Sequence, residues 1–90
     1  MHAAALAAPR AFGDTPVAGE RYRVRDDLNL RAAVGVNAPR LAVVPAGTQL
    51  RATGRHQGDW WQVSVVVDGR RQQGWASSLW LRRPQEASGL

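Results

Sequence analysis

The sequence predicts an all-β domain, a small antiparallel barrel or sandwich of about five to six short strands. Short segments in which apolar and polar residues alternate recur at close spacing, and Gly, Pro, Asn and Asp residues lie between them. The pair Asp68-Gly69 is a strong signal for a two-residue hairpin turn. Helix signals are nearly absent between residues 21 and 83. These observations together favour a single β-domain.

The first two predicted strands lie on either side of an acidic pair. Residues Arg21–Arg25 alternate strictly, which places Tyr22 and Val24 on one face and three arginines on the other. Asp26-Asp27 interrupts this strand, and alternation resumes in Leu28–Arg31. Because neighbouring side chains diverge on an extended chain, we expect the two carboxylates to serve a turn or a cap rather than act as a catalytic pair.

The middle of the sequence alternates between loop and strand signals. Gly, Asn and Pro residues predict a long loop over residues 32–39, after which residues 41–44 return to strand character. Pro45-Ala46-Gly47 predicts a turn, and Thr48–Thr53 alternates as a further strand. Residues 54–59 are polar, include His56, and predict a second turn.

The strongest strand is Trp60–Val67, because it is rich in aromatic and β-branched residues. Asp68-Gly69 then favours a turn with positive φ, and Gln72–Ala76 is the returning strand. Ser77-Ser78-Leu79 predicts a short turn of the kind that forms one turn of 3₁₀ helix. A last strand follows at residues 80–82.

The two ends of the chain differ from this pattern. Residues 1–20 contain a six-residue apolar run that Pro9 ends, and they predict a flexible tail or the remnant of a trimmed signal, since Ala5-Leu6-Ala7 has the small residues of a cleavage site. Residues 84–90 predict a C-terminal tail. The domain itself is expected to span residues 21–83.

Composition narrows the classes that this chain can belong to. The 90 residues fit one domain, contain no cysteine for disulfides or thiolate metal sites, and include no apolar run long enough to span a bilayer. The formal net charge is +5, and all 12 basic residues are arginine. A domain of this size buries only about 60% of its unfolded surface, so a few large side chains must supply the core.

The four tryptophans are expected to divide between the core and the surface. Adjacent strand residues face opposite sides, so Trp61 is placed in the core in phase with Val63 and Val65, with Tyr22 as a further core aromatic, whereas Trp60 faces outward. Trp75 is also assigned to the core, because Gly74 would let it sit against the neighbouring strand.

Four segments combine strand and turn residues in a fixed order: Leu28–Arg31, Pro45–Thr48, Gly58–Val63 and Gly74–Leu81. In order and spacing they resemble the bacterial SH3 (SH3b) family, over a stretch of about residues 22–82. The resemblance implies an SH3-like β-barrel and a binding module, most often for cell-wall peptidoglycan or its peptides. Ala76 stands where the eukaryotic SH3 pattern commonly has a proline, so recognition of proline-rich peptides is not implied.

The resemblance also implies candidate ligand-binding residues. Trp60 and Trp80 would form a shallow aromatic groove, and the alternative is that both pack beneath the loop 32–39. Asn29 and Arg31 would orient a peptide carboxylate, or instead fix that loop. Because such a ligand lies outside the cytoplasm, the resemblance also implies that the chain is exported to the periplasm, the envelope or the outside of the cell.

Two other functional classes stay open. A chain of one bare domain could dock on a protein partner as an inhibitor or an assembly subunit. A basic surface could attract nucleic acid, but the arginines are scattered and no nucleic-acid signature is present, so a nucleic-acid partner is disfavoured. No nucleophile–base arrangement, phosphate loop or metal-ligand spacing occurs, and the sequence therefore predicts neither an enzyme nor a cofactor.

Overall fold

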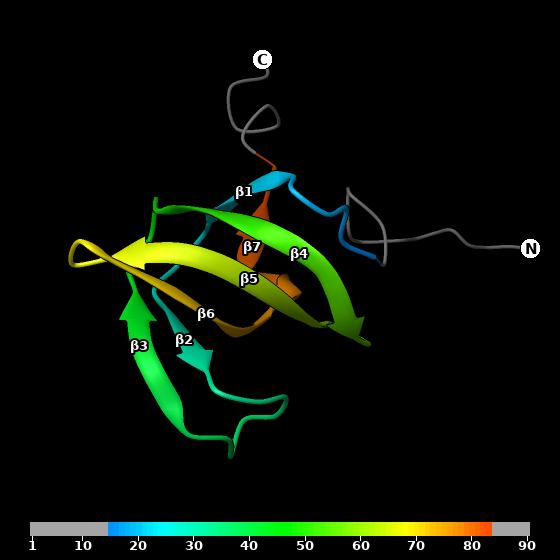
Figure 1. Ribbon diagram of the computed structural model, residues 1–90, viewed down its shortest axis with the longest axis horizontal. Helices are drawn as coiled ribbons and strands as arrows, with labels where there is room; N and C mark the ends of the chain where they lie inside the picture. Colours follow the sequence, from blue (N-terminus) through cyan, green and yellow to red (C-terminus); the bar gives the residue numbers. More distant parts are fainter. Residues whose placement is uncertain (1–14, 84–90) are drawn as a thin grey trace, which may run out of the picture.

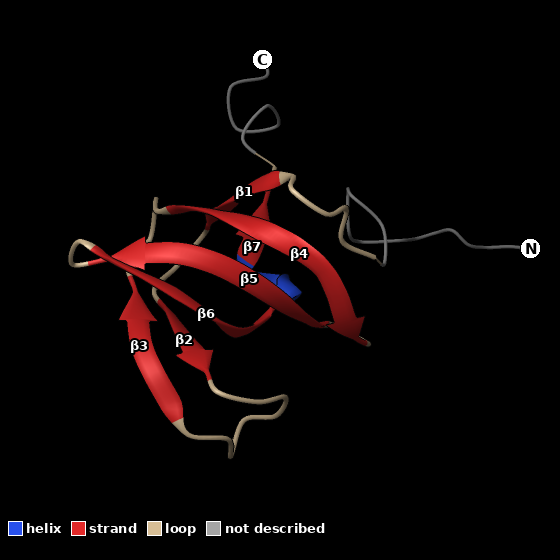
Figure 2. Ribbon diagram, in the orientation of Figure 1, coloured by secondary structure: helices blue, strands red, loops and turns tan. Residues whose placement is uncertain are grey.

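Seven antiparallel strands form one curled sheet in the computed structural model, which describes residues 15–83 (Figures 1 and 2). The sheet order is β3-β2-β6-β5-β4-β1-β7. The elements are β1 (Arg21–Val24), β2 (Leu28–Arg31), β3 (Arg40–Val44), β4 (Gln49–Gln57), β5 (Trp60–Val67), β6 (Arg70–Ser77), the 3₁₀ helix η1 (Ser78–Trp80) and β7 (Leu81–Arg82). The predicted all-β, SH3-like fold is confirmed. The strand count exceeds the expected five to six, and the two-residue β7 pairs with β1 as a strand of its own.

The β5–β6 hairpin sets the register of the centre of the sheet. Asp68 and Gly69 adopt φ angles of 53° and 78°, the positive values that a two-residue turn of this kind requires. Pairing then runs from Val67 opposite Arg70 to Trp60 opposite Ser77 without a shift. The start of β5 and the end of β6 are therefore held side by side.

Strand β4 is longer than the sequence predicts. It continues through residues 54–57, which were expected to form a turn, and only Gly58 and Asp59 separate it from β5. The β4–β5 register shifts between Ala52 and His56, and Gly54 has a φ of 101° within that irregularity. A bulge of this type bends its strand. The first part of β4 pairs with β1 through Gln49–Arg51, and β5 pairs with β4 on both sides of the bulge.

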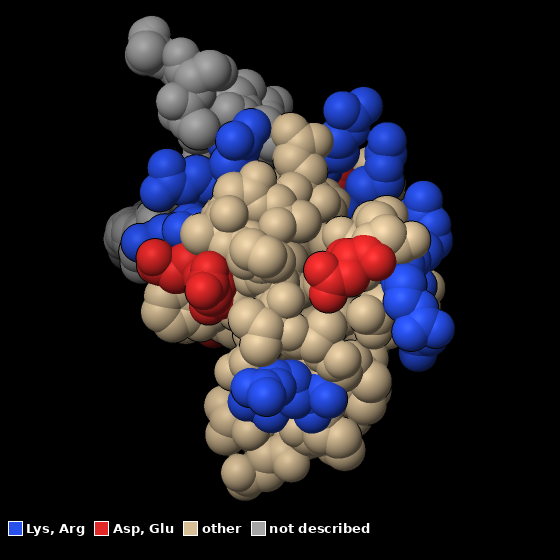
Figure 3. All heavy atoms as spheres, turned by 90° about the vertical axis from the view of Figure 1, so that its left-hand side faces the viewer, with Lys and Arg blue, Asp and Glu red and all other residues tan. Residues whose placement is uncertain are grey.

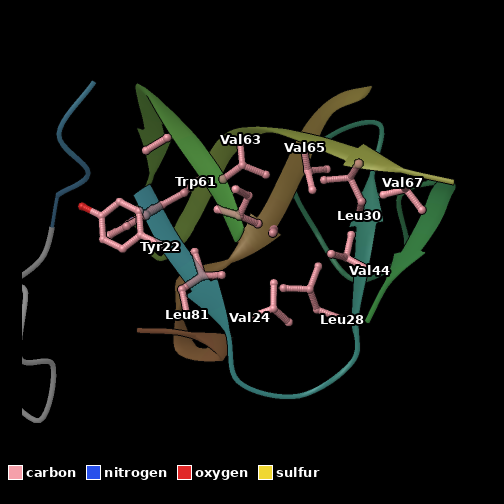
Figure 4. Close-up of a cluster of buried hydrophobic side chains, with 13 residues drawn as sticks. Tyr22, Val24, Leu28, Leu30, Val44, Trp61, Val63, Val65, Val67 and Leu81 are labelled. Carbon is pink, nitrogen blue, oxygen red and sulfur yellow. The ribbon is translucent and has the colours of Figure 1, made fainter. Parts of the chain in front are cut away.

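The core consists of the inward-facing residues of the alternating strands (Figure 4). Tyr22 and Trp61 are both completely buried, and their rings meet edge to face with centroids 5.2 Å apart and an interplanar angle of 72°. This geometry is one that aromatic pairs favour. The pair lies toward one end of the core, and smaller apolar side chains supply the rest of it: Val24, Leu28, Leu30, Val44, Leu50, Ala52, Val63, Val65, Val67, Ala76 and Leu81.

The assignment of Trp75 to the core is wrong. Trp75 is half-buried and lies outside the core cluster, because its neighbours Gly74 and Ala76 are the inward-facing positions of β6. It pairs with Gln62 of β5 and with Arg31 of β2, and so faces the outer surface of the sheet.

Part of the segment that was expected to be a tail lies against the sheet. Pro16 is buried, the Gly19 amide donates to the Ala52 carbonyl at 2.7 Å, and the Ala52 amide donates to the Glu20 carbonyl at 3.0 Å. The rest of the predicted N-terminal tail or signal remnant, residues 1–14, and the C-terminal tail at 84–90 lie outside the described residues. Within residues 15–83, no helix is long and apolar enough to cross a membrane.

Tyr22 should make folding sensitive to alkaline pH. Burial raises the pKa of its phenol above the ordinary value of 10.0. Because the folded state then holds the phenolic proton more tightly than the unfolded chain, this contribution to stability is complete below pH 10 and falls as the pH rises through the folded pKa. Tyr22→Phe cannot ionise, so urea midpoints measured from neutral pH to above pH 10 should fall less for the variant. Equal alkaline losses in both proteins would assign the effect to other groups.

Candidate ligand-binding groove

A groove of about 330 Å³ is built from residues of four separate parts of the chain. These parts are strand β2, the loop 32–39, the β4–β5 turn with the start of β5, and the end of β6 with η1. The aromatic groove, as we call it, is lined by Leu28, Asn29, Arg31, Val36, Asp59, Trp60, Ser77, Leu79 and Trp80.

All four residues that the sequence proposed as ligand contacts line this groove. Trp60 and Trp80 come from β5 and η1, and Asn29 and Arg31 come from β2. Trp80 is 44% exposed, so it does not lie buried beneath the loop 32–39, and Trp60 is half-buried. The loop instead adds Val36 to the groove lining. The geometry thus brings together two partly open indoles and two polar side chains.

The backbone around Trp80 is held by hydrogen bonds from three directions. The Ser78 amide donates to the Asp59 carbonyl at 2.8 Å, and the Leu79 amide donates to Ser77 Oγ at 3.3 Å. Arg25 donates its backbone amide to the Trp80 carbonyl at 2.7 Å and Nη1 to the Leu79 carbonyl at 3.2 Å. These bonds tie η1 to the β4–β5 turn and to the end of β1, so the position of Trp80 is fixed by the fold.

The Trp60 side chain points outward because the next residue, Trp61, points into the core and neighbouring strand residues face opposite sides. Trp60 pairs with Gln57 on one side and with Ser77 on the other, both in antiparallel register. This places its indole next to the segment that carries η1.

Asn29 and Arg31 project outward because Leu28 and Leu30 point into the core. Arg31 Nη1 donates to the Ala38 carbonyl at 2.8 Å, so this side chain does fix the loop 32–39. One such bond leaves further N–H donors on the five-donor guanidinium for a ligand. Arg40 Nη1 lies 3.4 Å from Asn29 Oδ1, at the long end of hydrogen bonding.

The groove combines apolar surface with opposite charges. Trp60, Trp80, Leu28, Val36 and Leu79 supply the apolar part of the lining, and Arg31 and Asp59 supply a guanidinium and a carboxylate. Such a surface can pack against flat or aliphatic ligand groups while orienting a carboxylate and an amine. Among residues 15–83, no group of three or more His, Cys, Asp or Glu residues could hold a metal ion.

Sequence reasoning did not propose five of the groove residues as ligand contacts: Leu28, Val36, Asp59, Ser77 and Leu79. Asp59 and Leu79 directly precede the two proposed tryptophans, and that adjacency was the available signal. Val36 lies in the loop 32–39, flanked by Gly35 and Asn37, and is 70% exposed. The loop also contains Val34 and three alanines, so no signal in the sequence singles out Val36.

Comparison with known families identifies this architecture. The family model for the bacterial SH3 domain matches residues 26–82, more than half of the chain. The chain belongs to the bacterial SH3 domain family. No curated protein and no solved structure matches it.

The segment of this bacterial SH3 domain that the family model matches contains the whole aromatic groove. The family consists of binding modules that are generally non-catalytic and that often occur in extracellular proteins. A binding role therefore follows from membership, whereas the ligand must be argued from the groove.

Proposed function

We propose that this bacterial SH3 domain binds cell-wall peptidoglycan, and that the aromatic groove holds a peptide of the wall. The observation that carries the proposal is the convergence of Trp60 and Trp80 with Arg31 and Asp59 in one groove. Indoles offer large, rigid contact surfaces to aliphatic side chains and to sugar rings. A short peptide with a free carboxylate and a free amine matches the two charges.

The polar residues would orient such a peptide. The Arg31 N–H groups that do not contact the Ala38 carbonyl would receive the peptide carboxylate, and Asn29 would add a donor and an acceptor beside it. Asp59 would attract the amine. A ligand in the wall also implies that this chain acts outside the cytoplasm, in the envelope or secreted, as many proteins of the family do.

A second candidate is docking on a protein partner. Leu79 is 53% exposed, and it lies with Val36 and Trp80 in the groove lining, so an exposed apolar surface is available there. Exposed apolar surface of this kind often marks an interaction site. Failure to bind peptidoglycan under any condition would favour this candidate.

Sedimentation with purified peptidoglycan tests the main proposal. We expect Trp60→Ala to weaken binding about tenfold at both low and high salt, because an anchoring indole contributes more than 1 kcal/mol. Trp75→Ala is the matched control, since this tryptophan is half-buried on the outer face but does not line the groove, and its affinity should change less than about threefold.

Two outcomes would contradict the groove as the wall site. Equal losses in the two tryptophan variants would show that the effect does not depend on the groove. Binding that disappears with salt and is indifferent to Trp60 would indicate a general charge effect. Circular dichroism of each variant checks that the fold is intact.

A further inference from the structure

Arginines from neighbouring strands form a row on the outer face of the sheet. Arg21 of β1 lies directly opposite Arg51 of β4, and Arg51 lies opposite Ser64 of β5. Their chain neighbours Tyr22 and Leu50 are buried, which fixes the arginines on the outside. Adjacent strands are about 4.8 Å apart, so the two guanidinium groups belong to one small area.

A second row lies beside the first. Arg82 of β7 pairs with Arg23 of β1, and Arg23 pairs with Gln49 of β4. Arg71 of β6 pairs with Val66 of β5 on the same outer face. The two rows place arginines from four strands on the outer face of the curled sheet. Figure 3 shows arginine side chains along its right-hand edge and at its upper left.

A hollow of about 320 Å³ lies among three of these arginines. The arginine hollow is lined by Arg21, Gln49, Leu50, Arg51, Ser64, Val65, Val66 and Arg71. It shares no lining residue with the aromatic groove. One water molecule occupies roughly 30 Å³ of liquid, so there is room for more than one small polar group.

Two of the three guanidiniums are oriented by the fold. Arg51 Nη1 donates to the Gly19 carbonyl at 3.1 Å, and Arg71 Nη1 donates to Ser64 Oγ at 3.2 Å. Each guanidinium has five N–H donors, so most of them stay available for a ligand. Orientation before binding lowers the entropic cost of holding an anion.

The charges in the arginine hollow are not balanced by the lining. Arg21 and Arg51 are like charges directly opposite each other on paired strands, an arrangement that disfavours a sheet. None of the lining residues is acidic. A bound anion would relieve this repulsion, which makes an anionic ligand the chemical complement of the site.

The arrangement favours phosphate over other anions. Three guanidiniums on three different strands can approach the several oxygens of a phosphate from different directions, whereas a carboxylate offers two oxygens in one plane. No aromatic side chain lines the hollow, so the stacking on which single-stranded nucleic acid relies is missing. Arg23 and Arg82 in the neighbouring row extend the positive surface for a chain of phosphates.

We propose that the arginine hollow is a second binding site, which takes the phosphate groups of a linear polyanion other than a nucleic acid. This site is independent of the peptide groove. Arg21 lies before residue 26, outside the segment that the family model matches, so the site uses a residue beyond that segment.

Titration with linear inorganic polyphosphate tests the proposal. The double variant Arg21→Gln/Arg51→Gln should bind the probe at least about tenfold more weakly than the parent. The slope of log affinity against log salt concentration should become shallower by about one for each phosphate that the variant no longer neutralises. The matched control is Arg40→Gln/Arg55→Gln, which removes the same charge from two exposed arginines outside the hollow. Its affinity should fall less than about threefold. Trp60→Ala should bind the probe like the parent.

The alternatives are separated by three further probes at equal salt: orthophosphate, poly-glutamate and an oligothymidylate. Weaker binding of all three than of polyphosphate supports the proposal. Equal losses in the two double variants, or no binding of polyphosphate by the parent at low salt, would overturn it. Poly-glutamate bound as tightly as polyphosphate would overturn the choice of phosphate. A tighter oligothymidylate complex would make the site one for nucleic acid. Thermal melts check that both double variants are folded.

Discussion

Trp61→Ala should lower the free energy of unfolding by about 3–5 kcal/mol, the largest effect that we expect from any single substitution in this domain. Trp61 is completely buried, packs edge to face on Tyr22, and pairs with Ala76 across the β5–β6 hairpin. Its removal leaves a cavity in the core beside Tyr22. Domains are stable by only about 5–15 kcal/mol, and small ones lie at the low end, so much of the population should be unfolded.

Trp60→Ala is the matched control for this prediction. It deletes the same side chain one residue earlier on the same strand, but from a half-buried position on the outer face. We expect it to cost about 1 kcal/mol. Urea unfolding followed by circular dichroism measures both variants, and similar losses at the two positions would contradict the division of the tryptophans between core and surface.

Local sequence rules predict most of this fold, because its strands alternate cleanly and its hairpin turn has distinctive residues. Tyr22, Val24, Leu28 and Leu30 all point inward, as the alternation of β1 and β2 requires. The irregularity in β4 is different. Whether residues 54–57 form a turn or continue a strand depends on their pairing with the neighbouring strand β5, and the residue types within the segment do not reveal that pairing.

The outward position of Trp75 follows from the residues of the β5–β6 hairpin turn. A two-residue turn at Asp68-Gly69 places Val67 opposite Arg70, and an unbroken register then places Trp75 opposite Gln62. Gln62 is in phase with the outward Trp60, so Trp75 must also face outward. The prediction failed because it considered the small size of Gly74 instead of following the register.

The aromatic groove could be predicted only in part. The four proposed residues lie on elements whose facing direction follows from alternation or from family resemblance. Val36, Asp59 and Leu79 meet them because a loop, a turn and a 3₁₀ helix converge in space, across more than forty residues of sequence. Such convergence depends on the tertiary structure and has no local signature.

Gly74 connects the stability of the fold to the groove. It lies at an inward position of β6, beside the point where β2 joins β6 through Arg31 and Trp75. A Cβ atom at Gly74 would lie 2.7 Å from the Arg31 carbonyl oxygen, 2.9 Å from Leu30 Cγ and 3.1 Å from Leu41 Cδ1. The nearest of these atoms belongs to the backbone, so a side chain here would push β2 and β6 apart.

Gly74→Ala should therefore destabilise the domain by about 1–3 kcal/mol and weaken peptidoglycan binding as well, because β2 carries Asn29 and Arg31 into the groove. Gln73→Ala is the control, since Gln73 is the adjacent residue of β6, is exposed on the outer face, and should change stability by less than about 0.5 kcal/mol. Urea midpoints and sedimentation with peptidoglycan would be measured for both variants. If Gly74→Ala leaves the free energy of unfolding unchanged, β2 can move aside without cost and the prediction is wrong. If the variant is destabilised but binds peptidoglycan normally, the shape of the groove does not depend on the β2–β6 junction.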